Sequence, residues 1–176
     1  MRIAFSGTHR TGKSTLLGQI AGQLPDHATV DEPYHLLEEE GHETPDVPSL
    51  EDFEAQLERS LAALEESGTD VLFDRCPADA LAYLLAHDDA DGFDADAWRG
   101  RVREAMATLD LVVFVPLERP DRIPLPAHED RAFRQDVHEK LEELLLDEGG
   151  YDIEVLCVEG DTASRVRQVM ARIRRP

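Results

Sequence analysis

The residues whose types and spacing best fit a chemical role occupy positions 7–14, with the sequence GTHRTGKS. They match the pattern G-x-x-x-x-G-K-[ST] and lie between the apolar segment Ile3–Ser6 and a helix that we expect to begin at Gly12. The glycines let the backbone curl until successive N–H groups converge on phosphate oxygens, and the helix N-terminus adds positive potential. Lys13 can reach the terminal phosphates of a nucleotide, and the Ser14 hydroxyl can bind Mg²⁺. The alternative is a glycine-rich strand-to-helix turn that binds no ligand.

The nucleotide contacts expected from this pattern cover the whole loop and the start of the helix. They are Gly7, Thr8, His9, Arg10, Thr11, Gly12, Lys13, Ser14 and Thr15. Lys13 is also an expected catalytic residue, because it reaches the β- and γ-phosphates between which the bond breaks.

The elements that must position this loop alternate along the chain. Short apolar runs predict strands at Ile3–Ser6, Ala28–Val30, Val71–Phe73, Leu111–Val115 and Ile153–Val158. Helical spacing and end signals predict helices at Gly12–Leu24, Tyr34–Glu39, Ser49–Gly68, from Pro77, around Val102–Met106, at Arg131–Leu146 and from Asp161 or Thr162. Alternating strands and helices imply parallel strands, and runs without polar alternation imply a sheet covered on both faces. We therefore expect a three-layer α/β fold with about five parallel strands.

Composition and charge narrow the function further. The 176 residues carry a formal net charge of −20, which excludes a nucleic-acid binder that works through a broad basic face. A polyanionic ligand must then be held by a local positive site. The longest apolar run, Leu111–Val115, cannot cross a bilayer, and no signal peptide is recognisable, so we expect a cytoplasmic protein of one domain, residues 1–176. Cys76 and Cys157 are expected to be free thiols.

Carboxylates follow two of the expected strands. Asp31 and Glu32 come directly after Ala28–Val30 and are followed by Pro33. Ligands of parallel sheets bind at the carboxyl ends of the strands, so a carboxylate here could accept the proton of a substrate hydroxyl or orient it. The alternative is that Asp31 or Glu32 caps the next helix, with Pro33 in its first turn.

The stretch FSGTHRTGKSTL resembles the phosphate loop of small P-loop kinases, especially ribosylnicotinamide kinases. The arrangement of the whole chain is similar to that of nucleoside and nucleotide kinases, including deoxynucleoside and thymidylate kinases. The resemblance is specific at the loop and architectural elsewhere. It implies a P-loop NTPase fold with strand order 2-3-1-4-5, a Mg-ATP donor and a small acceptor at the strand ends.

The same resemblance suggests roles for the strand-end residues. Glu32 matches the glutamate that faces the acceptor hydroxyl in deoxynucleoside kinases, which makes it an expected catalytic and substrate-binding residue. Asp74 and Arg75 look like the Asp-Arg pair of thymidylate kinases. Asp74 could then hold Mg²⁺ through water, and Arg75 could contact phosphate or substrate. The alternative is an Asp74 helix cap with an Arg75 salt bridge.

A possible lid lies at about 116–134, where the resemblance places an arginine-bearing segment that closes over the phosphates. Arg131 and Arg134 are three residues apart, which would put them on one helical face. Arginines there would neutralise transition-state charge and exclude water. The alternative is a solvated charged face.

These patterns favour an ATP-dependent phosphotransferase acting on a nucleoside, nucleotide or riboside, with ATP and a small acceptor as its partners and neither nucleic acid nor membrane among them. A regulatory or switch ATPase that acts through a protein partner is the alternative, and a nucleotide-binding protein without catalysis is a third possibility. The Asn-Lys-x-Asp motif that reads guanine in GTPases is absent from the sequence, which argues against guanine specificity.

Overall fold

The computed structural model describes residues 1–43, 45, 47–118, 123, 125–126, 130–147 and 151–174. Its centre is a five-stranded parallel sheet with the order β2-β3-β1-β4-β5, which confirms the expected arrangement. The strands are β1 (Arg2–Ser6), β2 (Ala28–Val30), β3 (Val71–Asp74), β4 (Leu111–Phe114) and β5 (Val155–Cys157).

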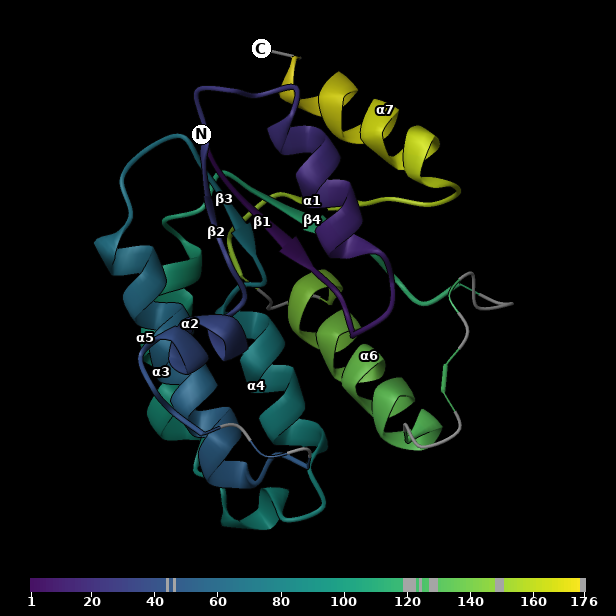
Figure 1. The fold of residues 1–176 in the computed structure, drawn as a ribbon. Coiled ribbons are helices and arrows are strands. Elements are labelled where there is room, and N and C mark those ends of the chain that lie inside the picture. Colours follow the sequence, from purple (N-terminus) through teal and green to yellow (C-terminus); the bar gives the residue numbers. More distant parts are fainter. Residues whose placement is uncertain are drawn as a thin grey trace.

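Helices cover both faces of this sheet, so the fold has three layers (Figure 1). One face carries α1 (Lys13–Ala21) and α7 (Thr162–Ile173). The other carries α3 (Leu50–Glu66), α4 (Pro77–Ala86), α5 (Ala95–Met106) and α6 (Arg131–Leu146). The short α2 (Pro33–Glu39) packs beside α3, and a single 3-10 turn spans Ala90–Gly92.

The strand residues alternate between these two layers. In β1, Ile3 and Phe5 pack with α1 and α7, whereas Ala4 faces the cluster formed by α3, α4, α5 and α6. In β4, Val113 and Phe114 are divided in the same way. A strand that is buried on both sides has no place for polar alternation, which is why the apolar runs identified these strands correctly.

Element ends differ from the expected ones at the sheet edge and around glycine. Helix α1 stops at Ala21, where Gly22 begins a looser turn, instead of continuing to Leu24. The edge strand β5 pairs only with Val112–Phe114 of β4, so it spans three residues rather than the expected 153–158. Helix α3 begins with a capping box, in which the Ser49 side chain accepts from the backbone N–H of Asp52 and the Asp52 side chain accepts from the backbone N–H of Ser49.

Three further expectations concern the rest of the chain. Of the possible lid at 116–134, residues 119–122, 124 and 127–129 lie outside the described residues. Cys76 and Cys157 are free thiols, the first buried and the second exposed. Among the described helices, none combines the length and the apolar character that crossing a bilayer requires.

Candidate active site

The loop at positions 7–14 connects β1 to α1 at the carboxyl end of the sheet (Figure 1). Its backbone turns through positive φ at Gly7 (144°), Arg10 (57°) and Gly12 (87°). A side chain at Gly7 would place its Cβ 2.5 Å from the carbonyl oxygen of Val115, so only glycine fits there. Residues with positive φ that alternate with residues of negative φ turn their backbone N–H groups toward one point, and such a turn forms an anion-binding hollow.

Lys13, near the end of this loop, is the first residue of α1 and is 5% exposed. Its Nζ lies 3.9 Å from Oδ1 of Asp74, at the end of β3. Burial lowers the pKa of Lys13, the charge of Arg75 lowers it further, and neighbouring carboxylates offset part of this. A polyphosphate bound in the loop would add compensating negative charge, so the site is prepared for an anion.

Asp74 reaches this position because β3 pairs with β1 in a register that sets Asp74 opposite Phe5. Its Oδ1 is buried and makes no hydrogen bond within the described part of the protein. A buried carboxylate oxygen of this kind fits a ligand to a hydrated cation. The second expected metal ligand, Ser14, is an exposed residue in the first turn of α1.

The described residues contain no cluster of three or more His, Cys, Asp or Glu side chains that could hold a metal by themselves. A Mg²⁺ ion beside Asp74 and Ser14 would therefore take most of its ligands from phosphate oxygens and water. This is the usual arrangement of Mg²⁺ in nucleoside triphosphate sites. The residues present fit such an ion.

Glu32 and Arg75 form a partly buried ion pair next to the loop, with Arg75 Nε 2.6 Å from Glu32 Oε2. Burial favours the neutral acid, but the charges of Arg75 and Lys13 and the hydrogen bond from Arg75 outweigh it and lower the pKa of Glu32 to about 2. Glu32 is the N-cap residue of α2, yet its side chain makes no capping hydrogen bond. Its carboxylate binds Arg75 instead. Pro33 does occupy the first turn of α2, as the capping alternative had it.

Arg75 connects this pair to the loop. Its NH1 lies 3.5 Å from the carbonyl oxygen of Gly7 and 3.7 Å from Oδ1 of Asp79, and its guanidinium lies over the Tyr83 ring at 5.3 Å. Its backbone has φ 82°, a left-handed conformation that is unfavourable for a non-glycine residue. Such strain tends to persist where the surrounding structure over-determines it, often at functional sites.

Asp79 is a site residue that the sequence analysis missed. Its side chain is fully buried, and Oδ1 accepts the backbone N–H of Gly7 at 3.0 Å. Oδ2 accepts from the backbone and the thiol of Cys76, where burial and the Asp79 charge raise the pKa of the thiol. The sequence signal was Asp79's position three residues after the N-cap of α4, which indicates a capping role but not the contact with the loop.

Arg131 and Arg134 have different surroundings, although they were expected on one face. Arg131 is exposed at the first position of α6, whereas Arg134 is 3% exposed. Arg134 donates from Nε to the carbonyl oxygen of His9 at 3.1 Å and from NH2 to that of Arg10 at 3.3 Å. Helix α6 thus brings Arg134 to the outside of the loop.

Arg165, on α7, is a second buried arginine at the loop and was also missed. It is 5% exposed, and its NH1 donates to the carbonyl oxygen of Thr11 at 2.7 Å. Its NH2 lies 3.2 Å from Oε1 of Glu118, which in turn accepts the backbone N–H of Gly160 at 2.7 Å. No local sequence pattern predicts the contact between Arg165 and Thr11, because these residues are 154 positions apart.

A cleft of about 850 Å³ adjoins the other side of the loop, and its lining includes His9, Arg10, Tyr34, Phe53, His87 and Phe133. Tyr83 supports this wall, because its hydroxyl lies 3.3 Å from the backbone N and 3.1 Å from Nδ1 of His9. The Phe53 and Tyr83 rings stack with centroids 5.2 Å apart. The cleft is large enough for a small organic ligand and offers aromatic surfaces to it.

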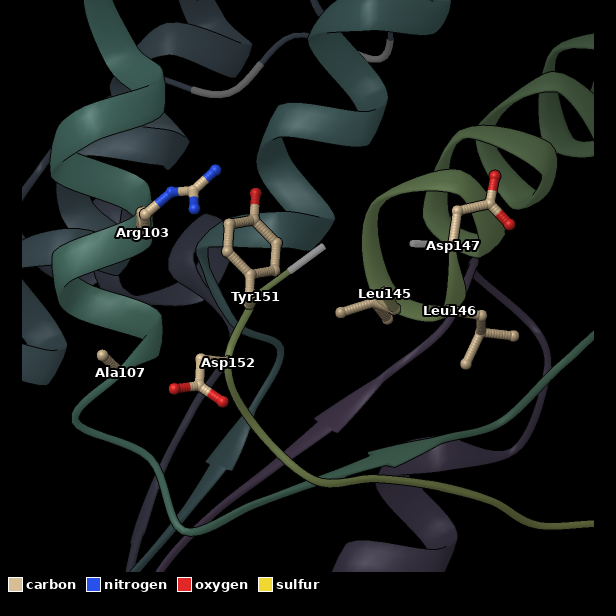
Figure 2. A pocket seen from close by; sticks show the side chains of 7 residues that line it. All are labelled: Arg103, Ala107, Leu145, Leu146, Asp147, Tyr151 and Asp152. Atoms are coloured by element: carbon tan, nitrogen blue, oxygen red, sulfur yellow. The ribbon is translucent and has the colours of Figure 1, made fainter. Parts of the chain in front are cut away.

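A different hollow, of about 430 Å³, lies near the ends of α5 and α6, where the chain enters β5 (Figure 2). Figure 2 shows Arg103 of α5 and Tyr151 on one side of it and Leu145, Leu146 and Asp147 on the other. Burial raises the pKa of Tyr151 to about 12. None of the phosphate-loop or strand-end residues lines this hollow, so we place the candidate site at the loop.

The fold and the loop together define a P-loop nucleotide-binding protein. The chain belongs to the AAA domain family, whose model matches residues 2–165. A comparison with curated proteins finds no match.

Solved structures of several kinases share the fold. Deoxyadenosine kinase from M. mycoides with bound dATP has a TM-score of 0.69 at 17% identity, over 99% of this chain and 100% of that one. Thymidylate kinase from Candida albicans has a TM-score of 0.64 at 17% identity, over 97% and 89% of the two chains. Shikimate kinase from Aquifex aeolicus has a TM-score of 0.58 at 17% identity, over 98% and 96%.

Proposed function

We propose that this protein is an ATP-dependent phosphotransferase, folded as a single P-loop kinase-like domain, that acts on a small metabolite of the nucleoside, nucleotide or riboside class. One observation carries the proposal. Arg75, whose NH1 lies 3.5 Å from the Gly7 carbonyl oxygen, holds the carboxylate of Glu32 beside the phosphate loop, and an aromatic-lined cleft of about 850 Å³ adjoins the same loop at His9 and Arg10. A triphosphate donor needs positive groups, so a fixed carboxylate next to the loop serves an acceptor better than it serves ATP.

On this proposal, the loop binds the phosphates through its N–H groups and Lys13. Ser14 and Asp74 would hold Mg²⁺, which when bound neutralises charge on the β- and γ-phosphate oxygens. Phosphoryl transfer requires little covalent assistance from a protein, so alignment and charge neutralisation are the main tasks of these residues. Arg131, exposed at the start of α6, remains our candidate for a contact made in the transition state.

The role of Glu32 follows from its acidity. A carboxylate with a pKa of about 2 stays ionised at neutral pH and is a weak base. It therefore acts chiefly by accepting a hydrogen bond from the acceptor hydroxyl and orienting that oxygen toward the γ-phosphate. Such weak basicity suffices where the transition state is loose and the attacking hydroxyl keeps its proton until late.

The experiment that tests the proposal is release of ADP from Mg-ATP with and without acceptors. The panel contains nucleosides, nucleoside monophosphates and ribosides, each added singly. We expect at least one of them to raise ADP release strongly and to appear as a phosphorylated product. Release that stays equal with and without every acceptor would favour the regulatory ATPase, and ATP binding without any release would favour a binding protein.

A further inference from the structure

Two buried arginines hold the outer side of the phosphate loop. Three consecutive carbonyl oxygens, of His9, Arg10 and Thr11, each accept a hydrogen bond from a guanidinium. Arg134 supplies the first two from α6, and Arg165 supplies the third from α7 at 2.7 Å. Helices from two layers of the fold thus converge on one short stretch of backbone.

Peptide geometry turns these outer contacts into an effect on the inner side. A peptide unit is planar and trans, so its C=O and N–H point in opposite directions. Fixing the carbonyl of His9 therefore fixes the N–H of Arg10, and the next two carbonyls fix the N–H groups of Thr11 and Gly12 in the same way. These N–H groups are the donors that a P-loop turns toward phosphate. A donor at the carbonyl also polarises the peptide and strengthens its N–H.

The burial of both side chains argues against an incidental arrangement. Arg134 is 3% exposed and Arg165 is 5% exposed. Removing a guanidinium from water is unfavourable unless hydrogen bonds compensate it. Arginine also suits this task better than lysine, because its planar fork can serve two acceptors at fixed angles. Arg134 does so with two adjacent carbonyls, and Arg165 does so with Thr11 and Glu118.

We infer that Arg134 and Arg165 are positioning residues for the polyphosphate of the donor. They hold three N–H groups of the loop in their binding orientation and place two guanidinium groups behind them, that of Arg165 paired with Glu118, in a protein with a formal charge of −20. The inference rests on the proposed function only in requiring that the loop binds a polyphosphate. It assigns Arg134 to ground-state binding of the donor, in place of the transition-state contact expected from the sequence.

The test is the dissociation constant of Mg-ATP and of Mg-tripolyphosphate, measured by calorimetry at 10 °C. The variants are Arg134→Ala and Arg165→Ala, with Arg134→Lys and Arg165→Lys in case an alanine variant does not fold. Two controls each remove one solvent-accessible positive charge from the same helices, namely that of the half-buried Lys140, paired with Glu143, in Lys140→Ala on α6 and that of the exposed Arg167 in Arg167→Ala on α7. Melting curves report the stability of each variant.

We expect each alanine variant to bind both ligands at least about tenfold more weakly, the scale of one lost charge-assisted hydrogen bond. The lysine variants keep the charge but lose the fork, so they should fall between the alanine variants and the parent. Both controls should stay within about twofold of the parent, as exposed charges contribute little.

Three outcomes would count against the inference. Parent-like affinity in folded Arg134 and Arg165 variants, even with lower melting temperatures, reduces both residues to structural ones. An equal loss of affinity in the control variants would show that the effect comes from the change in net charge. Failure of the parent itself to bind either ligand removes the proposed function as well, whereas binding by parent and variants alike overturns the positioning role alone.

Discussion

Replacing Glu32 by Gln tests the acceptor side of the site through both stability and turnover. The change keeps the size of the side chain and removes the charge that faces Arg75 at 2.6 Å. The pKa of Glu32 falls from 4.5 to about 2 in the folded protein, a difference of about 2.5 units. At about 1.4 kcal/mol per unit, the ionised carboxylate stabilises the folded state by roughly 3 kcal/mol.

The sign of the pH dependence follows from the lowered pKa. Well above pH 4.5 the carboxyl is ionised in both states, and its full stabilisation is present. As the pH falls from about 4.5 to about 2, the unfolded state binds the proton first and the stabilisation is lost. The free energy of unfolding of the parent should therefore exceed that of Glu32→Gln by roughly 3 kcal/mol at pH 7, and this difference should vanish near pH 2.

Urea unfolding of both proteins between pH 2 and pH 8 measures this difference. The contributions of the other carboxylates cancel, because both proteins contain them. Turnover is measured alongside it. We expect ATP affinity within a few-fold of the parent and acceptor-dependent turnover reduced by roughly a hundredfold. A stability difference that does not change with pH would refute the electrostatic reasoning. Unchanged turnover in a folded variant would leave Glu32 with only a structural role.

The other predictions concern the donor side. Lys13→Ala should weaken Mg-ATP binding at least about tenfold, about 1.4 kcal/mol, with a near-native melting curve, and unchanged affinity in calorimetry would contradict the assignment of Lys13. Asp74→Asn should raise the Mg²⁺ concentration that half-saturates ATP binding by roughly tenfold while metal-free ATP affinity stays similar, and an unaltered Mg²⁺ titration would remove Asp74 as a ligand. Arg131→Ala should lower kcat by roughly tenfold or more with little change in ATP affinity, and equal turnover would return Arg131 to the solvated face.

The parts of the fold and site that the sequence revealed are those encoded in contiguous residues. The loop at 7–14 is recognisable because its glycines and Lys13 must be close in sequence to surround one phosphate group. Glu32 and Asp74 could be placed near it because each directly follows a strand, and the carboxyl ends of parallel strands share an edge. Their roles stay predictions, but their positions follow from topology.

The rest of the site depends on contacts between distant segments. Asp79 meets Gly7 across 72 positions, and Arg165 meets Thr11 across 154, so no local spacing reports either contact. Arg134 shows a related limit of prediction from sequence. Helical spacing predicts which residues share a face, but the loop carbonyls opposite Arg134 belong to another part of the chain.

The contact between Arg165 and Thr11 sets an order of events during synthesis. Thr11 leaves the ribosome early, whereas Arg165 is added 154 residues later. At about 5–20 residues per second, that interval is roughly eight to thirty seconds. Throughout it a nascent chain carries the complete phosphate-binding motif but lacks the helix that supports Thr11. If Arg165 positions the loop as inferred, the growing polypeptide therefore reaches its full affinity for nucleotide only when α7 has been made and has packed against α1.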